Sequence, residues 1–352
     1  MKKLIAMLLA LAMVLSLAAC GAKEEPAEAP AADAPAAEAP AEAPAEEAAE
    51  ADLITVGFAQ VGHESDWRMA NTADYQKIFS EENGYELMFV DCDNDNAVQI
   101  EAVRTSIQQD VDYIVLAPIQ SAGWEAVLQE AKDAGIPVIV ADRQVDAPAE
   151  MYDAFIGTDT YVEGVAAGNW LAEYLNGEPA KILEIYGTIG ASAAIGRAEG
   201  FAEVMADHPE WELLDSQSGD FTQTGGQEVM ESFIKSYSDF NVLYCHNDNE
   251  AYGAMDAMDA AGITYGIGGD VIIISFDATH DGLQYTLDGK IHCNVECNPI
   301  QAQYVADIIQ QMEAGEEFAT YTLVQDSAFC APGIESEYAI TMTQEILDGR
   351  AY

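Results

Sequence analysis

Three of the five arginines in this sequence lie just beyond apolar runs of the kind that form buried strands. Arg143 directly follows Asp142 at the end of one run, Arg68 follows another, and Arg197 lies in the helical segment after a third. Arginine carries a rigid fork of donors that suits paired oxygens, and aspartate supplies acceptors. Because the chain holds 62 acidic residues but only 13 Lys and Arg, we interpret this grouping as a binding site. A solvated strand end is the alternative for Asp142 and Arg143.

Further polar and aromatic side chains follow the ends of the same apolar runs. Carboxylates and amides bind hydroxyl groups, and flat aromatic faces cover apolar C–H patches. Aromatic faces together with forked donors and carboxylates are the chemistry of a sugar site. For Trp67 the alternative is that it packs against its own domain. The candidate residues are Glu64, Trp67, Arg68, Asp142, Arg143, Arg197, Asp220, Phe221, Asn247, Asp248, Asp277, Asn294 and Glu296.

The elements that must position these residues alternate between strand and helix from Leu53 onward. Continuous apolar runs separated by helices indicate parallel sheets that are covered on both faces. The pattern restarts after residues 153–159, which predicts an α/β fold of two doubly wound parallel-sheet lobes in tandem, joined by a hinge. Ligands bind beyond the carboxyl ends of such strands, so we expect the site between the lobes. The predicted helices cover residues 68–83, 95–109, 121–134, 161–175, 192–207, 224–237, 249–261, 279–288 and 300–313, with Ser121 as the cap of the third.

The chain begins with a segment typical of export. Within residues 1–20, two lysines precede an apolar run that is too short for a comfortable membrane span. The run closes with Leu-Ala-Ala-Cys, which resembles the lipobox of bacterial lipoproteins, where the thiol of Cys20 is acylated. An ordinary secretory signal with an incidental Cys is the alternative. Residues 21–52 are almost only Ala, Pro and Glu, which predicts a disordered tether. We therefore expect a protein outside the cytoplasm, anchored to the membrane by lipid on Cys20.

Several other classes of function are disfavoured. The formal net charge of −49 would repel phosphate backbones, so we expect no nucleic-acid partner. The histidines show no metal-ligand spacing, and no HExxH, GxSxG or phosphate-loop motif occurs, so we expect no catalytic residues, metal or cofactor. "DCDNDN" at 91–96 imitates a calcium loop without its Gly and Glu, and we interpret it as a strand-to-helix turn. Of the cysteines beyond Cys20, one pair could form a disulfide that the sequence does not select.

Five motifs, which cover nearly the whole chain after the tether, resemble those of a known family. They are "VGFAQVGHESDWR", "AVRTSIQQDVDYIVLAPIQSAGWEAVLQEAKDAGIPVIVADR", "GTIGASAAIGRAEGF", "SQSGDFTQTGGQEVMESFI" and "HNDNEAYGAMDAM". The chain resembles periplasmic sugar-binding proteins of the ribose-binding class, which serve ABC importers, and within that class the galactofuranose-binding proteins. The resemblance implies a monomeric protein of the type I periplasmic fold. Such a protein captures a monosaccharide, such as galactofuranose, ribose or another pentose or hexose, and delivers it to an ABC permease. A sensor module that presents its ligand to a membrane signalling receptor is the alternative.

The resemblance also implies ligand-binding roles for ten candidate residues. Those of the first lobe, with Trp67 stacking on the sugar, are Glu64, Trp67, Arg68, Asp142 and Arg143. Those of the second are Arg197, Phe221, Asn247, Asp277 and, near the hinge, Glu296. We expect the first lobe to comprise residues 53–157 plus about 298–325, and the second to comprise 158–297 plus about 326–352. The galactofuranose pattern has Gly and Asp where this sequence has Asp66 and Gly196, and we expect these departures to alter which hydroxyls are accepted.

Overall fold

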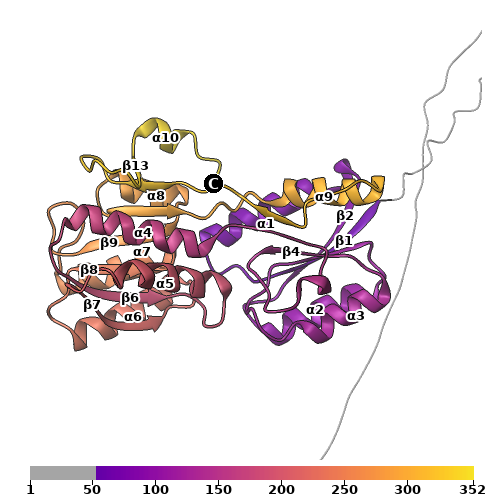
Figure 1. Ribbon diagram of the computed structural model, residues 1–352, viewed down its shortest axis with the longest axis horizontal. Coiled ribbons are helices and arrows are strands. Elements are labelled where there is room, and N and C mark those ends of the chain that lie inside the picture. Colours follow the sequence, from indigo (N-terminus) through magenta and orange to yellow (C-terminus); the bar gives the residue numbers. More distant parts are fainter. Residues whose placement is uncertain (1–52) are drawn as a thin grey trace, which may run out of the picture. The chain divides into compact units, whose positions relative to one another are not determined.

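A computed structural model describes residues 53–352 and contains two β-sheets, each with its own layers of helices (Figure 1). The predicted signal peptide, tether and Cys20 lie outside these described residues. The predicted α/β fold of two doubly wound lobes is confirmed. Within residues 53–352, no helix is both long enough and apolar enough to cross a lipid bilayer.

The sheet of the first lobe is entirely parallel. Its central strands are short runs of Val, Ile and Leu, and β3 and β4 are buried along their whole length. A strand buried on both faces must be covered by helices on both sides. In spatial order the strands are β11 (Tyr321–Leu323), β5 (Ala154–Gly157), β4 (Val138–Asp142), β3 (Tyr113–Leu116), β1 (Ile54–Gln60) and β2 (Tyr85–Asp91).

The sheet of the second lobe is parallel except where β12 runs antiparallel to β10. The exception arises because the chain returns from the first lobe in the opposite direction to add β12 at this edge. In spatial order the strands are β13 (Ile340–Thr341), β12 (Ala328–Cys330), β10 (Cys293–Glu296), β9 (Ile272–Asp277), β8 (Val242–Cys245), β6 (Ala180–Tyr186) and β7 (Trp211–Ser218).

Helices cover both faces of each sheet. On the first sheet α1 packs with α9 on one side and α2 with α3 on the other (Figure 1). On the second sheet α4 and α5 share one apolar cluster, and α6 and α7 share another on the opposite face. Two short helices, α8 and α10, pack on each other near β12. The helices are α1 (Asp66–Ile78), α2 (Asn96–Gln108), α3 (Glu125–Ala134), α4 (Thr160–Leu175), α5 (Ser192–Met205), α6 (Gln223–Ser236), α7 (Asp248–Ala261), α8 (His280–Leu287), α9 (Ala302–Ala314) and α10 (Gln344–Asp348).

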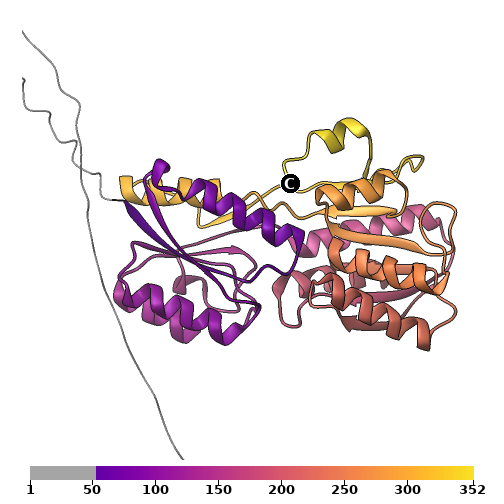
Figure 2. The ribbon, with the colours of Figure 1, turned by 180° about the vertical axis from the view of Figure 1, so that it is seen from behind.

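The chain passes between the lobes three times, after β5, after β10 and after β11. Figure 2 shows the consequence from behind. The orange helix α9 lies beside the indigo helix α1 of the first lobe, and the yellow C-terminal segment lies on the second lobe. Each lobe is therefore built from segments that are far apart in the sequence.

Two of the helix starts that differ from the sequence prediction are explained by local hydrogen bonds. The third helix begins at Glu125, not at Ser121, because the backbone of Ser121 bonds elsewhere: its N–H donates to Gly190 and its carbonyl accepts from Asp146. Trp124, fully buried, occupies the cap position instead. The first helix begins two residues earlier than predicted, at Asp66, because the Ser65 hydroxyl accepts a bond from the backbone N–H of Arg68.

Candidate functional site

Several strand ends carry polar or aromatic residues on left-handed backbone that glycine adopts more easily. Asp142 ends β4 with φ of 64°, and Asp277 ends β9 with φ of 95°. Asp220 and Phe221, just beyond β7, have φ of 55° and 60°. Each such residue costs about 1–3 kcal/mol unless surrounding contacts impose the conformation. Their grouping at the carboxyl ends of three strands of a doubly wound fold marks this end as the functional one.

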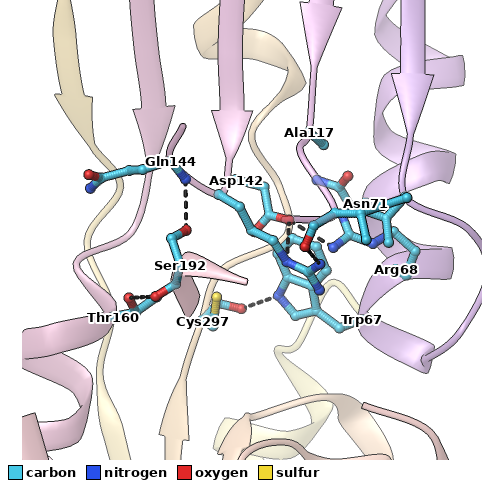
Figure 3. Close-up of polar contacts among 12 residues, drawn as sticks. Trp67, Arg68, Asn71, Ala117, Asp142, Gln144, Thr160, Ser192 and Cys297 are labelled. Atoms are coloured by element: carbon cyan, nitrogen blue, oxygen red, sulfur yellow. Dashed lines mark hydrogen bonds and ion pairs between the residues drawn. The ribbon is translucent and has the colours of Figure 1, made fainter. Parts of the chain in front are cut away.

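Arg68 organises the polar groups of the first lobe. It lies in the first turn of α1, where Ser65 fixes the helix start. Its Nε donates to Glu64 at 3.0 Å, and one terminal nitrogen donates to Gln60 at 3.0 Å. The other terminal nitrogen donates to Asp142 at 2.8 Å (Figure 3). Burial opposes the charge of Arg68, but the carboxylates of Asp142 and Glu64 together hold its pKa above the ordinary value. Three of the five N–H donors of this guanidinium are thus already used.

Arg143 is buried in the same cluster but is less completely bonded. Its nitrogens lie 3.8 Å from the carboxylates of both Glu64 and Asp142, beyond hydrogen-bonding distance, and one nitrogen donates to the Ile119 carbonyl at 3.4 Å. Its guanidinium lies 5.0 Å from the ring centroid of Phe221, a residue of the other lobe. Burial and the neighbouring charge of Arg68 lower the pKa of Arg143. Its remaining donors are available to a ligand.

Arg197 is the corresponding cation of the second lobe. Its Nε donates to Glu163 on α4 at 2.8 Å, and a terminal nitrogen lies 3.4 Å from Asp277. Another terminal nitrogen donates to the backbone carbonyl of His246. Its guanidinium also lies over the ring of Phe276, 4.7 Å from the centroid. Although burial opposes the charge, Glu163 and the other nearby acids raise the pKa of Arg197.

The loop that carries Phe221 is held by two buried side chains at the start of α7, one of them from the residue that caps the helix. The Glu250 carboxylate accepts the backbone N–H of Phe221 at 2.9 Å. The Asn247 amide donates to the Phe221 carbonyl at 2.9 Å and caps α7 by accepting from the N–H of Glu250. These bonds explain how a large aromatic residue is kept in left-handed conformation beside Arg143.

The side chains line one cleft, the inter-lobe cleft, with an empty volume of about 290 Å³. Nine of the ten residues that the family resemblance singles out lie in its lining. They are Glu64, Trp67, Arg68, Asp142, Arg143, Arg197, Phe221, Asn247 and Asp277. Ser65, Ala193 and Cys297 also line the cleft and were missed. A helix-cap signal could have found Ser65, but an alanine and a buried thiol look like core residues in a sequence.

Glu296 is the exception among the ten, because it does not line the cleft. Its carboxylate accepts bonds from Arg350 at 2.8 Å, from Tyr352 at 2.6 Å and from the backbone N–H of Ser327 at 2.9 Å. Two residues of the C-terminal segment thus form hydrogen bonds with this carboxylate. The next residue, Cys297, lines the cleft instead, and its carbonyl accepts the Trp67 indole N–H at 2.5 Å (Figure 3).

The other polar candidates beyond the strands are also engaged elsewhere. Asp248 accepts bonds from Ser275, Thr279 and Asn294 in a buried network. Asp220 is exposed and bonds to Ser218. None of Asp220, Asp248 and Asn294 is part of the cleft lining.

The two departures from the galactofuranose pattern also lie outside the cleft lining. The backbone N–H of Asp66 donates to the Asn249 side chain at 3.0 Å, and the Asn249 amide donates to the Asp66 carboxylate at 3.2 Å. Gly196 faces α4, where an added Cβ would lie 2.2 Å from the Thr160 hydroxyl. Neither position therefore meets a ligand in the cleft directly.

Charge is nearly balanced within the cleft. Three arginines face three lining carboxyl groups, of which Asp277 has a pKa raised well above its ordinary value by burial, and Glu163 adds a fourth acid behind Arg197. One carboxylate oxygen, Oε2 of Glu64, is buried without a hydrogen-bond partner. A buried acceptor without a partner is costly, so this atom is suited to accept a hydroxyl from a ligand. Within residues 53–352, no group of three or more His, Cys, Asp or Glu side chains is arranged to hold a metal ion.

Comparisons with known proteins agree on one family. Residues 56–317 match the model of the periplasmic binding protein domain. The chain is similar to the galactofuranose-binding protein of Escherichia coli (strain K12), at 40% identity over 262 residues, which are 73% of this chain and 81% of that protein.

Two solved structures are also similar to the chain. One is a protein of Mycobacterium smegmatis in complex with β-D-fucofuranose, at 44% identity and a TM-score of 0.76, with 79% of this chain and 91% of that one covered. The other is the periplasmic binding protein component of the arabinose ABC transporter from Shewanella sp. ANA-3, bound to α- and β-L-arabinofuranose. It has 36% identity and a TM-score of 0.74, with 78% and 91% covered.

Proposed function

Because the chain belongs to the periplasmic binding protein domain family, we propose that it captures an uncharged monosaccharide between its lobes and delivers it to the permease of an ABC importer. The observation that carries the proposal is the inter-lobe cleft, where Trp67, Phe221, three arginines and three carboxylates converge from both lobes. The proposal assigns no chemical step to the protein. The cleft residues bind, and the transporter moves the sugar.

The balance of charge in the cleft favours a neutral sugar over a uronic acid. Arg68 and Arg197 each contact carboxylates at 2.8 Å, so their charges are already compensated. A ligand carboxylate would have to compete with buried acids such as Glu64 and Asp142, and burying a further like charge is unfavourable. Hydroxyl groups can instead accept from Arg143 and donate to the free oxygen of Glu64.

A five-membered sugar ring is the form that we propose. The relatives described above are a galactofuranose-binding protein and proteins bound to fucofuranose and arabinofuranose. We propose the ten assigned residues other than Glu296 as its contacts, with Trp67 stacking on the ring.

We further propose that the protein acts outside the cytoplasm as a monomer, tethered by residues 21–52 and by lipid on Cys20. Support comes from the sequence of the N-terminal segment, which lies outside the described residues. The ligand would shift the population toward closed lobes, since only the closed form presents both half-sites at once. The permease would then recognise the closed form.

The test is a thermal-shift screen of the purified chain with neutral furanosyl sugars, pyranose sugars, uronic acids, nucleosides and amino acids. We expect a furanosyl sugar to raise the midpoint of unfolding, because a ligand that binds only the folded state stabilises it by mass action. A response to uronic acids alone would overturn the neutral-sugar assignment. A response to nucleosides or amino acids alone, or no response at all, would remove the sugar proposal.

The importer role needs a second measurement, because a sensor module would bind the same sugar. Deletion of the gene should abolish uptake of the radiolabelled sugar that the screen identifies. Uptake that persists while sugar-induced gene expression is lost would assign the protein to signalling instead.

A further inference from the structure

We propose that Cys293 and Cys330 form a disulfide that joins β10 to β12 in the second lobe. Both are thiols in the structure. The inference rests on the proposed extracytoplasmic location, since disulfides persist in oxidising compartments and are rare in the cytosol. The pairing is one that the sequence leaves open and that the strand register selects.

The register of the antiparallel pair places the two cysteines directly opposite each other. Two other pairs of the same ladder, one directly before the cysteines and one three positions after them, show which kind of position this is. The N–H of Ala331 donates to His292 at 3.0 Å, and the N–H of Glu296 donates to Ser327 at 2.7 Å, so both of these pairs are hydrogen-bonded. Because bonded and non-bonded pairs alternate, Cys293 and Cys330 form a non-hydrogen-bonded pair.

A non-hydrogen-bonded pair has the backbone spacing that a disulfide needs. Its Cα atoms lie about 4.5 Å apart, within the range of about 4.4–6.8 Å found across disulfides. Its two side chains also lie on the same face of the sheet. Both cysteines are fully buried in the same apolar cluster, together with Trp170 and Ala331. Burial and, less strongly, the negative charge of Cys330 raise the pKa of the Cys293 thiol.

The other described cysteines are placed apart from this pair. Cys92 lies in the core of the first lobe, and Cys245 lies in the cluster on the opposite face of the second sheet. Cys297 lines the inter-lobe cleft, where its sulfur is 3.4 Å from the Thr158 hydroxyl. Within residues 53–352, the cross-strand register therefore favours one pairing.

The bond would tie together two of the three chain crossings. Cys293 precedes the crossing after β10, and Cys330 follows the crossing after β11. The segment between them contains α9 and β11, which belong to the first lobe. The disulfide would therefore close a loop around this insertion and fix where both crossings leave the second lobe. It would also hold β12, a strand of three residues, on its sheet.

The chemistry is a two-electron oxidation. Two S–H bonds are broken, one S–S bond forms, and two protons and two electrons leave. The oxidant is the disulfide form of a thiol–disulfide oxidoreductase, which is reduced to its dithiol through a mixed disulfide. Because both sulfurs are buried in the folded lobe, exchange occurs before β12 docks against β10.

The first experiment is a non-reducing peptide map of the full chain, purified from the cell envelope and alkylated under denaturing conditions. A protease that cuts after glutamate is needed, because Cys293, Cys297 and Cys330 all lie between Lys290 and Arg350 and trypsin leaves them together. Cleavage after Glu separates them into peptides 251–296, 297–313 and 318–335. We expect peptides 251–296 and 318–335 to be linked, with a mass about 2 Da below the sum of the two thiol forms.

A second measurement follows stability with and without reductant. Reduction should lower the unfolding midpoint of the wild type by about 5 °C, because the bond closes a loop of roughly 40 residues. Cys330→Ala should abolish this dependence on reductant, whereas Cys245→Ala, a matched buried thiol on the other face, should retain it. If Cys330→Ala does not fold, the wild-type comparison and the peptide map still decide.

Free thiols at both positions in the exported chain, or a link between any other two cysteines, would overturn the proposal. A reduced sample is then treated with oxidised glutathione. If the bond forms under this treatment, the geometry permits it and the cellular compartment does not supply the oxidation; if it does not form, the geometry is wrong. The proposed function fails independently, since it depends on the thermal response to sugars. If the peptides are linked but no sugar changes the unfolding midpoint, the disulfide proposal stands and only the sugar-binding proposal fails.

Discussion

At the scale of single residues, the three arginines of the inter-lobe cleft differ in how completely their donors are used. Arg68 and Arg197 hold short contacts to carboxylates, and their raised pKa values reflect them. Arg143 is equally buried but reaches its nearest carboxylates only at 3.8 Å. Arg68 and Arg197 therefore hold neighbouring carboxylates of the cleft in place. Arg143 is the arginine with the most N–H donors left for a ligand.

Replacement of Arg143 by Ala should weaken sugar binding by about tenfold or more, since hydrogen bonds to a charged group contribute about 1.5–3 kcal/mol. The fold should persist, because the side chain makes only one hydrogen bond within the protein. Isothermal titration with the sugar found by the screen measures the change. Arg104→Ala is the control, as Arg104 pairs with Glu130 on the exposed surface. An unchanged dissociation constant in the Arg143 variant would remove the site assignment.

His292 gives a residue-scale prediction about pH. Burial lowers its pKa to about 4, and its Nδ1 accepts the backbone N–H of Ile273 at 3.2 Å, so the folded protein holds the ring neutral. The unfolded chain has the ordinary pKa near 6.5 and gains a proton as the pH falls through that value. The contribution of His292 to stability is therefore full above about pH 6.5 and is lost as the pH falls toward 4.

From pH 7 to pH 5 this group should lower the free energy of unfolding by about 2 kcal/mol. Denaturant titrations of the wild type and of His292→Gln, whose amide oxygen can still accept from Ile273, should differ in pH slope by that amount. Equal slopes for the two proteins would contradict the neutral, buried ring.

At the scale of elements, α4 and α5 approach unusually closely because each carries two glycines four residues apart. Gly164 and Gly168 lie on α4, and Gly196 and Gly200 lie on α5. An added Cβ at Gly164 would lie 2.3 Å from the carbonyl oxygen of Arg197, and one at Gly200 would lie 2.1 Å from that of Tyr161. The helix pair thus sets the backbone position of Arg197 in the cleft.

Gly200→Ala should lower the free energy of unfolding by about 1–3 kcal/mol, because the added methyl group forces the two helix backbones apart. The higher helix propensity of Ala would raise the free energy of unfolding, but we expect the clash between the two helices to be the larger effect. Gly349→Ala is the matched control, since its φ is −86° and an added Cβ meets nothing closer than 3.4 Å. Chemical denaturation measures both, and equal stability of the two variants would contradict the close approach of α4 and α5.

At the scale of the whole molecule, several direct bonds join the lobes in addition to the three chain crossings. The Trp67 indole bonds to Cys297, the N–H of Gln144 bonds to the Ser192 hydroxyl at 2.8 Å, and Asp66 bonds reciprocally with Asn249 (Figure 3 shows the first two). The Asp66 pair lies outside the cleft lining, so we expect it to act on sugar binding through closure of the lobes and not through contact with the sugar.

Asp66→Gly should raise the dissociation rate of the sugar roughly fivefold, since it removes one side-chain hydrogen bond that holds the lobes together. Stopped-flow measurement of tryptophan fluorescence provides the rate. Glu125→Gly is the control, because Glu125 is likewise an acid in the first turn of a helix and is exposed. A variant that selects different sugars at an unchanged rate would show instead that Asp66 contacts the ligand.

Most of the fold, and the place of nine candidate residues in the cleft lining, could be predicted because their signals are local. Buried parallel strands read as continuous apolar runs, and polar residues at their carboxyl ends share one edge of the sheet. The position of Glu296 outside the cleft lining could not be predicted, because the alternation of side chains along β10 and the partners Arg350 and Tyr352 cannot be read from the strand itself. Ser121 was misassigned because its backbone bonds to Gly190 in the other lobe.

The sequence alone determined the class of fold, the residues that stand at strand ends and the kinds of groups that they offer. Tertiary structure decided which groups meet. Arg68 finds Asp142 across 74 positions, Asp66 finds Asn249 across 183, and Cys293 faces Cys330 through strand register. The physical reason is that strand and helix formation depend on near neighbours, whereas a partner in a cleft or across a sheet is fixed only when distant segments pack.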